Sequence, residues 1–324
     1  MAFMDASLKG RDDMTSTVVS VGLPVTEVLE IKKKHLEPIK LTGKEKRICI
    51  VTGIYGDELE GQYVCYELIR RIQARMDLLE GIVDVYPAVN PLGIESIQRK
   101  IPTFDLDLNR NFPGNEDGDL VEHTAARLVQ DIIGADMCID LHSSNVFIRE
   151  IPQVRMVNGT DPELIEYAKM LNVDFVWIHK SNTVLEATLV HTLNTLGVPA
   201  MAIEMGVGTR ITKEFGEQIV DGIFHLLSEL GIWKGKVKET KTPIISTDGE
   251  VKLIHAETSG IFIPKVEHWI GIRKGDVVGE IIDPCEGKVL EQITAPIDGT
   301  VFSLREYPIV YEGSLIARVL GGGL

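Results

Sequence analysis

Apolar runs alternate with segments of helical spacing along the first 230 residues of the chain. Short apolar runs bounded by turn formers are typical of buried strands, and apolar residues three or four positions apart are typical of helices. We predict strands at 46–51, 82–86, 137–141, 154–157, 174–178 and 199–206. We predict helices at 58–75, 119–133, 162–171, 183–196 and 212–230. This alternation predicts an α/β fold in which helices cover both faces of a sheet.

The pattern weakens at two places within this region. Residues 18–45 carry only weak strand signals, and residues 90–114 show little periodicity of either kind. We predict the second stretch to be a long irregular loop. Such loops are uncommon inside compact domains and are often functional.

The pattern changes after Trp233. From there onward, short apolar runs are separated by Gly, Pro and Asp residues, and no long helical spacing appears. We therefore predict two domains, an α/β domain at 1–235 and a small β-barrel or β-sandwich domain at 236–324. Within the second domain, Asp298 followed by Gly299 predicts a tight hairpin.

Composition argues against several classes of partner. The chain has 324 residues, with 33 Lys and Arg against 48 Asp and Glu, which gives a formal net charge of −15. Such a charge disfavours binding to nucleic acid or to an anionic membrane. The four cysteines are scattered, the chain does not begin with a signal pattern, and no apolar run is long enough to span a membrane. We expect a cytoplasmic protein with neither nucleic-acid nor membrane partners.

A turn rich in glycine and acid follows the first strong strand. Gly53 and Gly56 permit a tight turn, and Asp57 and Glu58 follow at the start of the next predicted helix. Carboxylates at this position can cap a helix and interact with its dipole. They can also line a ligand site, because open α/β sheets bind ligands at the carboxyl ends of their strands.

Three further groups of polar residues occupy equivalent places. They are Arg99, Asn109 and Arg110 in the predicted loop, His142 directly after a strand, and Glu204 near the end of an apolar strand. Simpler interpretations remain open, since the arginines could pair with nearby Asp105, Asp107 or Glu116, and a lone histidine after a strand is often structural. Glu204 is costly to bury without a partner, which favours a functional carboxylate.

Four ordered motifs carry a resemblance to a known family. They are Gly53-x-Tyr-Gly-Asp-Glu58, Asp107-Leu-Asn-Arg110, Asp140-Leu-His142 and Ile203-Glu204. With them, residues 45–320 resemble the succinylglutamate desuccinylase/aspartoacylase group of the zinc carboxypeptidase (M14-type) superfamily. The resemblance implies a carboxypeptidase-like mixed sheet with helices on both faces and a small C-terminal all-β domain.

The resemblance also implies a role for each matched residue. A zinc ion would be held by Glu58, by His142 and by the residue at position 55. Glu204 matches the general base and proton shuttle, and Arg99 matches the arginine that stabilises the oxyanion. Asn109 and Arg110 match the pair that grips a substrate carboxylate. Asp140 could orient a metal ligand such as His142 without binding the metal itself.

The chain departs from the family pattern at Tyr55, where the first motif has histidine. A neutral tyrosine is a poor zinc ligand, since its reference pKa is about 10. Zinc could bind a phenolate, the site could use two protein ligands and extra water, or the chain could be a naturally or artificially inactivated variant.

We predict a zinc-dependent amidohydrolase that releases an acyl group from a small-molecule N-acyl amino acid or N-acyl amine. The alternative is a metal-poor binding or regulatory protein on the same scaffold. We expect the C-terminal domain to shape the site entrance or to form a contact in a homo-oligomer.

Overall fold

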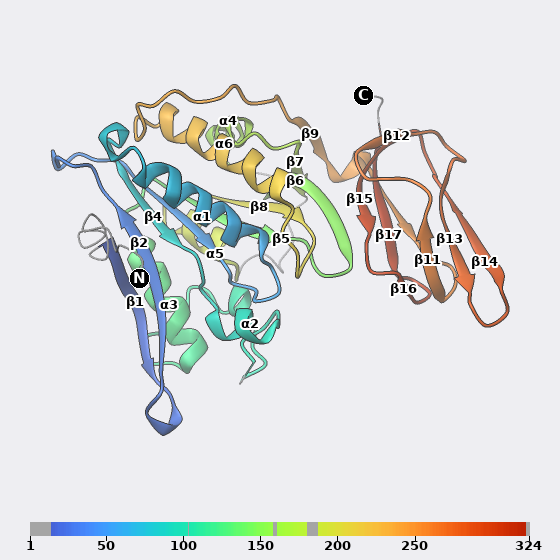
Figure 1. Cartoon of the computed structure of the whole chain (residues 1–324), viewed down its shortest axis with the longest axis horizontal. Helices are drawn as coiled ribbons and strands as arrows, with labels where there is room; N and C mark the ends of the chain where they lie inside the picture. Colours follow the sequence, from blue (N-terminus) through green and yellow to red (C-terminus); the bar gives the residue numbers. More distant parts are fainter. Residues whose placement is uncertain (1–13, 103, 158–160, 180–186, 322–324) are drawn as a thin grey trace, which may run out of the picture.

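A large mixed sheet runs through the molecule. The computed structural model describes residues 14–102, 104–157, 161–179 and 187–321 (Figure 1). The strands of the first part are β1 (Thr15–Gly22), β2 (Val28–Leu36), β3 (Arg47–Thr52), β4 (Ile82–Tyr86), β5 (Met137–Ser143), β6 (Ile148–Val157), β7 (Phe175–His179) and β8 (Ala200–Gly206). Their central order is β1-β2-β4-β3-β5-β8-β6, and β3, β4, β5 and β8 are mutually parallel. Residues 18–45, where the sequence carries only weak strand signals, contain most of β1 and all of β2, and these two strands pair antiparallel.

Helices pack on both faces of this sheet, as predicted. They are α1 (Glu60–Gln73), α2 (Pro91–Ser96), α3 (Leu120–Ile132), α4 (Pro162–Met170), α5 (Leu189–Thr195) and α6 (Lys213–Glu229). One core joins α1, α4 and α6 to one face of the sheet, and a second core joins α3 and α5 to the other. The alternation of side chains along β3 is visible in these cores, because Ile48 and Ile50 enter the first and Cys49 and Val51 enter the second.

The C-terminal part is all-β, as predicted. Its strands are β9 (Ile244–Thr247), β10 (Val251–His255), β11 (Gly260–Pro264), β12 (Ile270–Ile272), β13 (Val277–Asp283), β14 (Lys288–Thr294), β15 (Gly299–Arg305), β16 (Ile309–Val310) and β17 (Leu315–Gly321). Strands β14-β13-β11-β16 form a separate antiparallel sheet, on the right of Figure 1. The other five extend the large sheet, in which β15 pairs with β6 and β9 pairs with β7. The domain boundary between residues 235 and 236 stays a prediction.

Three local predictions were wrong or incomplete. Residues 90–114 are not one irregular loop, because they contain α2 and a short 3-10 helix at Leu108–Arg110. Helix α2 begins at Pro91, and the side chain of Asn90 accepts a hydrogen bond from the Gly93 N–H. No hairpin forms at Asp298-Gly299, since β14 pairs with β13 and β15 pairs with β17. Of the helix predicted at 183–196, the structure shows α5, while residues 180–186 lie outside the described residues.

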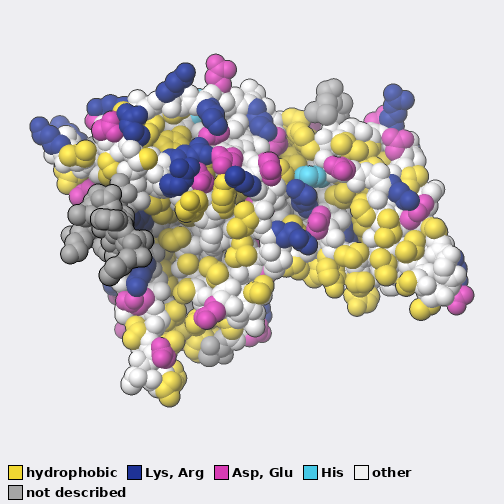
Figure 2. Space-filling view, viewed as in Figure 1, with side chains coloured by type: hydrophobic (Ala, Val, Ile, Leu, Met, Phe, Trp, Pro, Cys, Tyr) yellow, Lys and Arg dark blue, Asp and Glu magenta, His cyan; other side chains and the backbone are white. Residues whose placement is uncertain are grey.

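Two features of the described part of the chain bear on its surface. No helix among the described residues is long and apolar enough to cross a membrane. On the face drawn in Figure 2, Lys and Arg side chains lie among Asp and Glu side chains rather than in a continuous basic patch.

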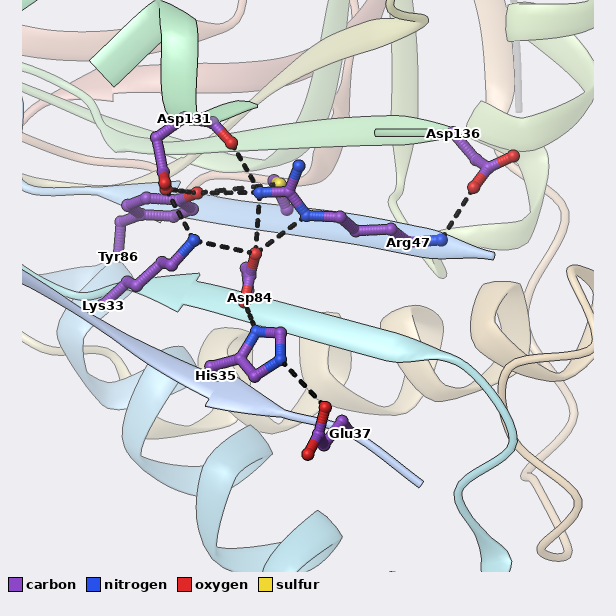
Figure 3. A network of polar contacts seen from close by, with 9 residues as sticks. Lys33, His35, Glu37, Arg47, Asp84, Tyr86, Asp131 and Asp136 are labelled. Atoms are coloured by element: carbon purple, nitrogen blue, oxygen red, sulfur yellow. Dashed lines mark hydrogen bonds and ion pairs between the residues drawn. The ribbon is translucent and has the colours of Figure 1, made fainter. Parts of the chain in front are cut away.

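A buried polar network links β2, β3, β4 and α3 near one edge of the large sheet (Figure 3). Asp84 of β4 is almost fully buried and accepts hydrogen bonds from Arg47 Nε at 2.8 Å and from Lys33 Nζ at 3.3 Å. His35 Nδ1 lies 2.6 Å from the same carboxylate. Asp131 of α3 accepts from Lys33 at 2.7 Å and thereby joins the helix to the strands.

The charge state of Asp84 links this network to pH. Burial alone would raise the pKa of Asp84, but His35, Lys33 and Arg47 outweigh burial and lower that pKa below its ordinary 3.8. Because the folded-state pKa is the lower one, the stabilisation is present above pH 3.8 and is lost as pH falls through the folded-state value.

We predict that Asp84→Asn lowers the free energy of unfolding by about 3 kcal/mol, because it leaves buried cations without their partner. Asp77→Asn is the matched control, since Asp77 is exposed and pairs only locally with Arg75. Its effect should stay below about 0.5 kcal/mol. Urea unfolding at pH 7 measures both variants, and equal effects would contradict a structural role for the network.

Candidate functional site

The four motifs meet at the carboxyl ends of the central strands. His142 of β5 and Glu204 of β8 are register partners, so both side chains project from the same face of the sheet. Tyr55 and Glu58 lie in the turn between β3 and α1. Arg99 follows α2. All five side chains line one cavity of about 1160 Å³.

The turn after β3 is fixed against α2 by a close backbone approach. A Cβ on Gly56 would lie 1.9 Å from the Gly93 carbonyl carbon, so only glycine fits there. The Gly56 N–H also donates to the Gln98 carbonyl at 3.1 Å. These contacts hold Tyr55, Glu58 and the segment that carries Arg99 in one arrangement.

Glu58 is the centre of the site. Its Oε2 lies 3.0 Å from His142 Nδ1 and accepts the Ser143 backbone N–H at 3.1 Å, and its Oε1 accepts from Arg99 Nη1 at 3.0 Å. The other ring nitrogen of His142 lies 2.8 Å from Asp140 Oδ2, as expected for a residue that orients the imidazole. The sequence left open that Arg99 pairs with Asp105, Asp107 or Glu116. In the structure, its ion pair is with Glu58.

Burial and charge set the protonation of this pair. Burial raises the pKa of Glu58 to about 7, although the hydrogen bond from His142 opposes that rise. Burial would lower the pKa of His142, but Asp140 and Glu58 outweigh it and raise that pKa well above 6.5. The pair therefore retains a proton near neutral pH.

Tyr55 lies beside this pair but is directed elsewhere. Its hydroxyl is 3.5 Å from Asp107 Oδ2, and its ring carries the Arg99 guanidinium, whose Cζ is 3.4 Å from the ring centroid. A cation over an aromatic ring contributes about 1 kcal/mol when it is partly exposed, as Arg99 is. Burial raises the pKa of Tyr55 above its ordinary 10.0, so the phenol is neutral at pH 7.

The donors that the structure describes do not complete a three-ligand zinc site. Glu58 and His142 converge and could each donate to a metal ion. Among the residues that the structure describes, no group of three His, Cys, Asp or Glu side chains could hold one. An open catalytic zinc site uses three protein ligands and a water. The assignment of Tyr55 as the third ligand stays a prediction.

The predicted substrate-binding pair lies at the side of the same cavity. Asn109 is buried, and its Oδ1 accepts the Leu189 backbone N–H at 2.9 Å, which joins the second motif to α5. The Arg110 guanidinium donates from Nη1 to the Asn109 carbonyl at 2.8 Å. Both residues line the cavity. Their roles in substrate binding stay predictions.

A second charged cluster, which was not predicted from the sequence, lies beside Glu204. Arg155 of β6 lies 3.4 Å from Glu204 Oε1 and 2.5 Å from Oε2 of the fully buried Glu150. Arg318 of β17 also contacts Glu150, so a residue of the C-terminal part reaches the cavity. Burial raises the pKa of Glu204 above its ordinary value, and Arg155 opposes that rise. Arg155 is a charged residue in a predicted apolar strand, and that signal could have identified it.

The contact between Glu150 and Arg318 should couple β6 to β17 energetically. In a double-mutant cycle of Glu150→Gln and Arg318→Met, we predict a coupling free energy of about 1–3 kcal/mol, as for a buried ion pair in contact. Pairing Glu150→Gln with Arg273→Met, an exposed arginine of the same C-terminal part, provides the matched control. Chemical denaturation measures both cycles, and additivity in the first would show that the contact carries no energy.

Comparisons with known proteins give matches that extend over most of the chain. It is 26% identical over 286 residues to the N-alpha-acetyl-L-2,4-diaminobutyric acid deacetylase of Halomonas elongata, covering 86% of this chain and 82% of the relative. Its fold is similar to the succinylglutamate desuccinylase/aspartoacylase structure from Rhodobacter sphaeroides, with a TM-score of 0.79, 22% identity and 95% of each chain covered. It is also similar to the product-bound ectoine utilization protein EutE (DoeB) from Ruegeria pomeroyi, with a TM-score of 0.78, 18% identity and coverage of 95% and 99%.

The family model for the succinylglutamate desuccinylase/aspartoacylase catalytic domain matches residues 44–230, which is more than half of the chain. This range contains all four motifs and the residues Glu58, Arg99, His142 and Glu204. The chain therefore belongs to the succinylglutamate desuccinylase/aspartoacylase family.

Proposed function

We propose that this chain is a deacylase that hydrolyses the amide bond of a small N-acyl amino acid or N-acyl amine. Deacylation is the reaction of its family, and the Halomonas elongata relative is a deacetylase by name. The observation that carries the proposal is that His142 and Glu204 lie opposite each other on neighbouring strands. Both line the same cavity as Glu58, Arg99 and Arg110.

Each residue of the site has a chemical task in this proposal. The Glu204 carboxylate takes a proton from the attacking water and passes it to the leaving amine, which suits a carboxylate whose pKa is raised by burial. The Arg99 guanidinium faces the acyl oxygen as negative charge develops on it. Arg110 and the Asn109 amide hold the carboxylate of an amino-acid substrate, for which a guanidinium fork is well shaped.

The position of Glu204 supports its role as the base. Its side chain is partly open to the cavity, at 19% of its accessible surface, and Arg155 holds one oxygen. Arg155 is a positioning residue in this scheme, because it contacts the base and not the substrate. Glu150 in turn contacts Arg155, and Arg318 contacts the other oxygen of Glu150.

A second candidate function is favoured by one observation. Tyr55 occupies a predicted ligand position, and Arg99 covers its ring. These features suit a protein that binds an N-acyl amino acid without cleaving it. Hydrolysis and binding therefore need to be measured separately on the same preparation.

We predict that Glu204→Gln lowers kcat by about 10²-fold or more with a smaller change in ligand affinity, since general acid–base catalysis contributes at least this much. The assay is amine release from a panel of N-acetyl and N-succinyl amino acids that includes N-acetylated diamino acids. Glu229→Gln, at the end of α6 and away from the cavity, is the matched control and should retain full activity.

The same experiment distinguishes the two candidates. If the parent protein releases no amine from any member of the panel and yet binds one of them by calorimetry, the binding protein is the correct interpretation. Hydrolysis that survives unchanged in Glu204→Gln would instead show that another residue is the base.

A further inference from the structure

The Tyr55 ring and the Glu58 carboxylate share one cation, the Arg99 guanidinium. Arg99 Cζ lies 3.4 Å from the centroid of the Tyr55 ring, and Arg99 Nη1 lies 3.0 Å from Glu58 Oε1. Both partners are nearly fully buried, while the Arg99 side chain is 41% exposed toward the cavity. The guanidinium therefore lies between two of the three side chains predicted to hold a metal ion.

We propose that Arg99, stacked on Tyr55, replaces a divalent cation as the positive charge that neutralises Glu58, so that the centre of this chain operates without a bound metal. The residue at position 55 then decides between two states of the site. Tyrosine provides the surface for a guanidinium, and histidine would provide a third metal ligand. This inference concerns the charge of the centre and does not require that the protein hydrolyses an amide.

Arg99 contributes to compensating the buried charge of Glu58. A buried carboxylate is stable only when cations or hydrogen-bond donors compensate it. Here, Arg99, His142 and the Ser143 N–H together contact both oxygens of Glu58. A divalent ion on the same carboxylate would meet the positive charge of Arg99 at close range, and like charges repel strongly in a buried site. Metal binding would therefore require Arg99 to leave both Glu58 and Tyr55.

The described residues around Glu58 and His142 also supply too few metal ligands. Among the residues that the structure describes, no third His, Cys, Asp or Glu joins Glu58 and His142 in a group that could hold a metal ion. The Tyr55 hydroxyl lies within reach of Asp107, at 3.5 Å, so that side chain is oriented toward the second motif. Asp140 is bonded to the far nitrogen of His142 and positions the ring.

The Tyr55 ring is well placed to bind a guanidinium. The rings of Tyr55 and His142 lie 5.5 Å apart between centroids, so His142 supports Tyr55 from one side. Arg99 lies over the face of the Tyr55 ring, in the geometry that the quadrupole of an aromatic ring favours for a cation. The exposed part of the guanidinium remains available to an anionic group of a ligand in the cavity.

The test measures zinc binding to the full chain after removal of metal with a chelator. Zinc titration by calorimetry and metal analysis after desalting are carried out on the parent, Tyr55→His and Tyr55→Phe. We expect the parent and Tyr55→Phe to retain far less than one zinc per chain. Tyr55→His should bind zinc at least about 100-fold more tightly than the parent. Losing a residue that only supports a metal ligand already weakens metal binding by up to that factor, and this change adds a ligand that contacts the metal directly.

Two controls make the outcome specific. Tyr311→His introduces a histidine at an exposed tyrosine of the C-terminal part and should leave zinc binding as weak as in the parent. Arg99→Met removes the competing cation without adding a ligand and should raise zinc affinity above that of the parent. Circular dichroism confirms that each variant is folded, and Arg99→Met supplies the answer if Tyr55→His does not fold.

Three results would overturn the inference. If the parent binds one zinc tightly and Tyr55→Phe loses it, Tyr55 is a phenolate ligand. If the parent and Tyr55→Phe both bind zinc tightly, Glu58 and His142 are sufficient as protein ligands. If Tyr55→His and Arg99→Met both bind zinc as weakly as the parent, neither residue governs the charge of the centre. None of these readouts depends on amine release, so they are separate from a failure of the proposed deacylation.

Discussion

The compensation of one buried carboxylate, Glu58, is the constraint on which the site depends. Glu58 contacts a guanidinium from the segment after α2, an imidazole from β5 and a backbone N–H from the end of the same strand. These groups come from far apart in the sequence, so the carboxylate is stable only when three segments are correctly placed. The close approach of Gly56 to α2 and the parallel pairing of β3 with β5 provide that placement.

The register of the central sheet explains why the chemistry lies on one face. Along β5 and β8, the residues Ile139, Leu141 and Ile203 enter the core under α1 and α6. Asp140, His142 and Glu204 alternate with them and therefore point to the opposite face. Beyond Glu204, β6 runs antiparallel to β8 and brings Arg155 and Glu150 to the same place. Arg318 then joins β17 to this cluster, so the C-terminal part supports the cavity as well as extending the sheet.

Helices and strands were predicted well where the apolar spacing within the element itself determines its structure. The strand at 82–86 matches β4, and apolar spacing located α1, α3 and α6 within a few residues. The position of His142 and Glu204 at strand ends predicted their convergence, because the ends of parallel strands meet at one edge. Helix α2 was missed although Asn90 and Pro91 are a local start signal for a helix.

What could not be predicted depends on contacts between distant segments. Asp298-Gly299 has the local chemistry of a hairpin, but the strands on either side pair elsewhere. The pairing of Arg155 with Glu204 requires β6 to run antiparallel to β8, which no local pattern indicates. Likewise, Tyr55 could be identified as a departure from its family, but its stacking with Arg99 depends on how α2 packs against the turn after β3.

The most direct test of this account is anomalous diffraction at the zinc edge from crystals of the parent protein grown with zinc. The account predicts Arg99 density flat against the Tyr55 ring and no anomalous peak between Glu58 and His142. A strong peak about 2.0–2.2 Å from both side chains, with Arg99 displaced from Tyr55, would contradict it.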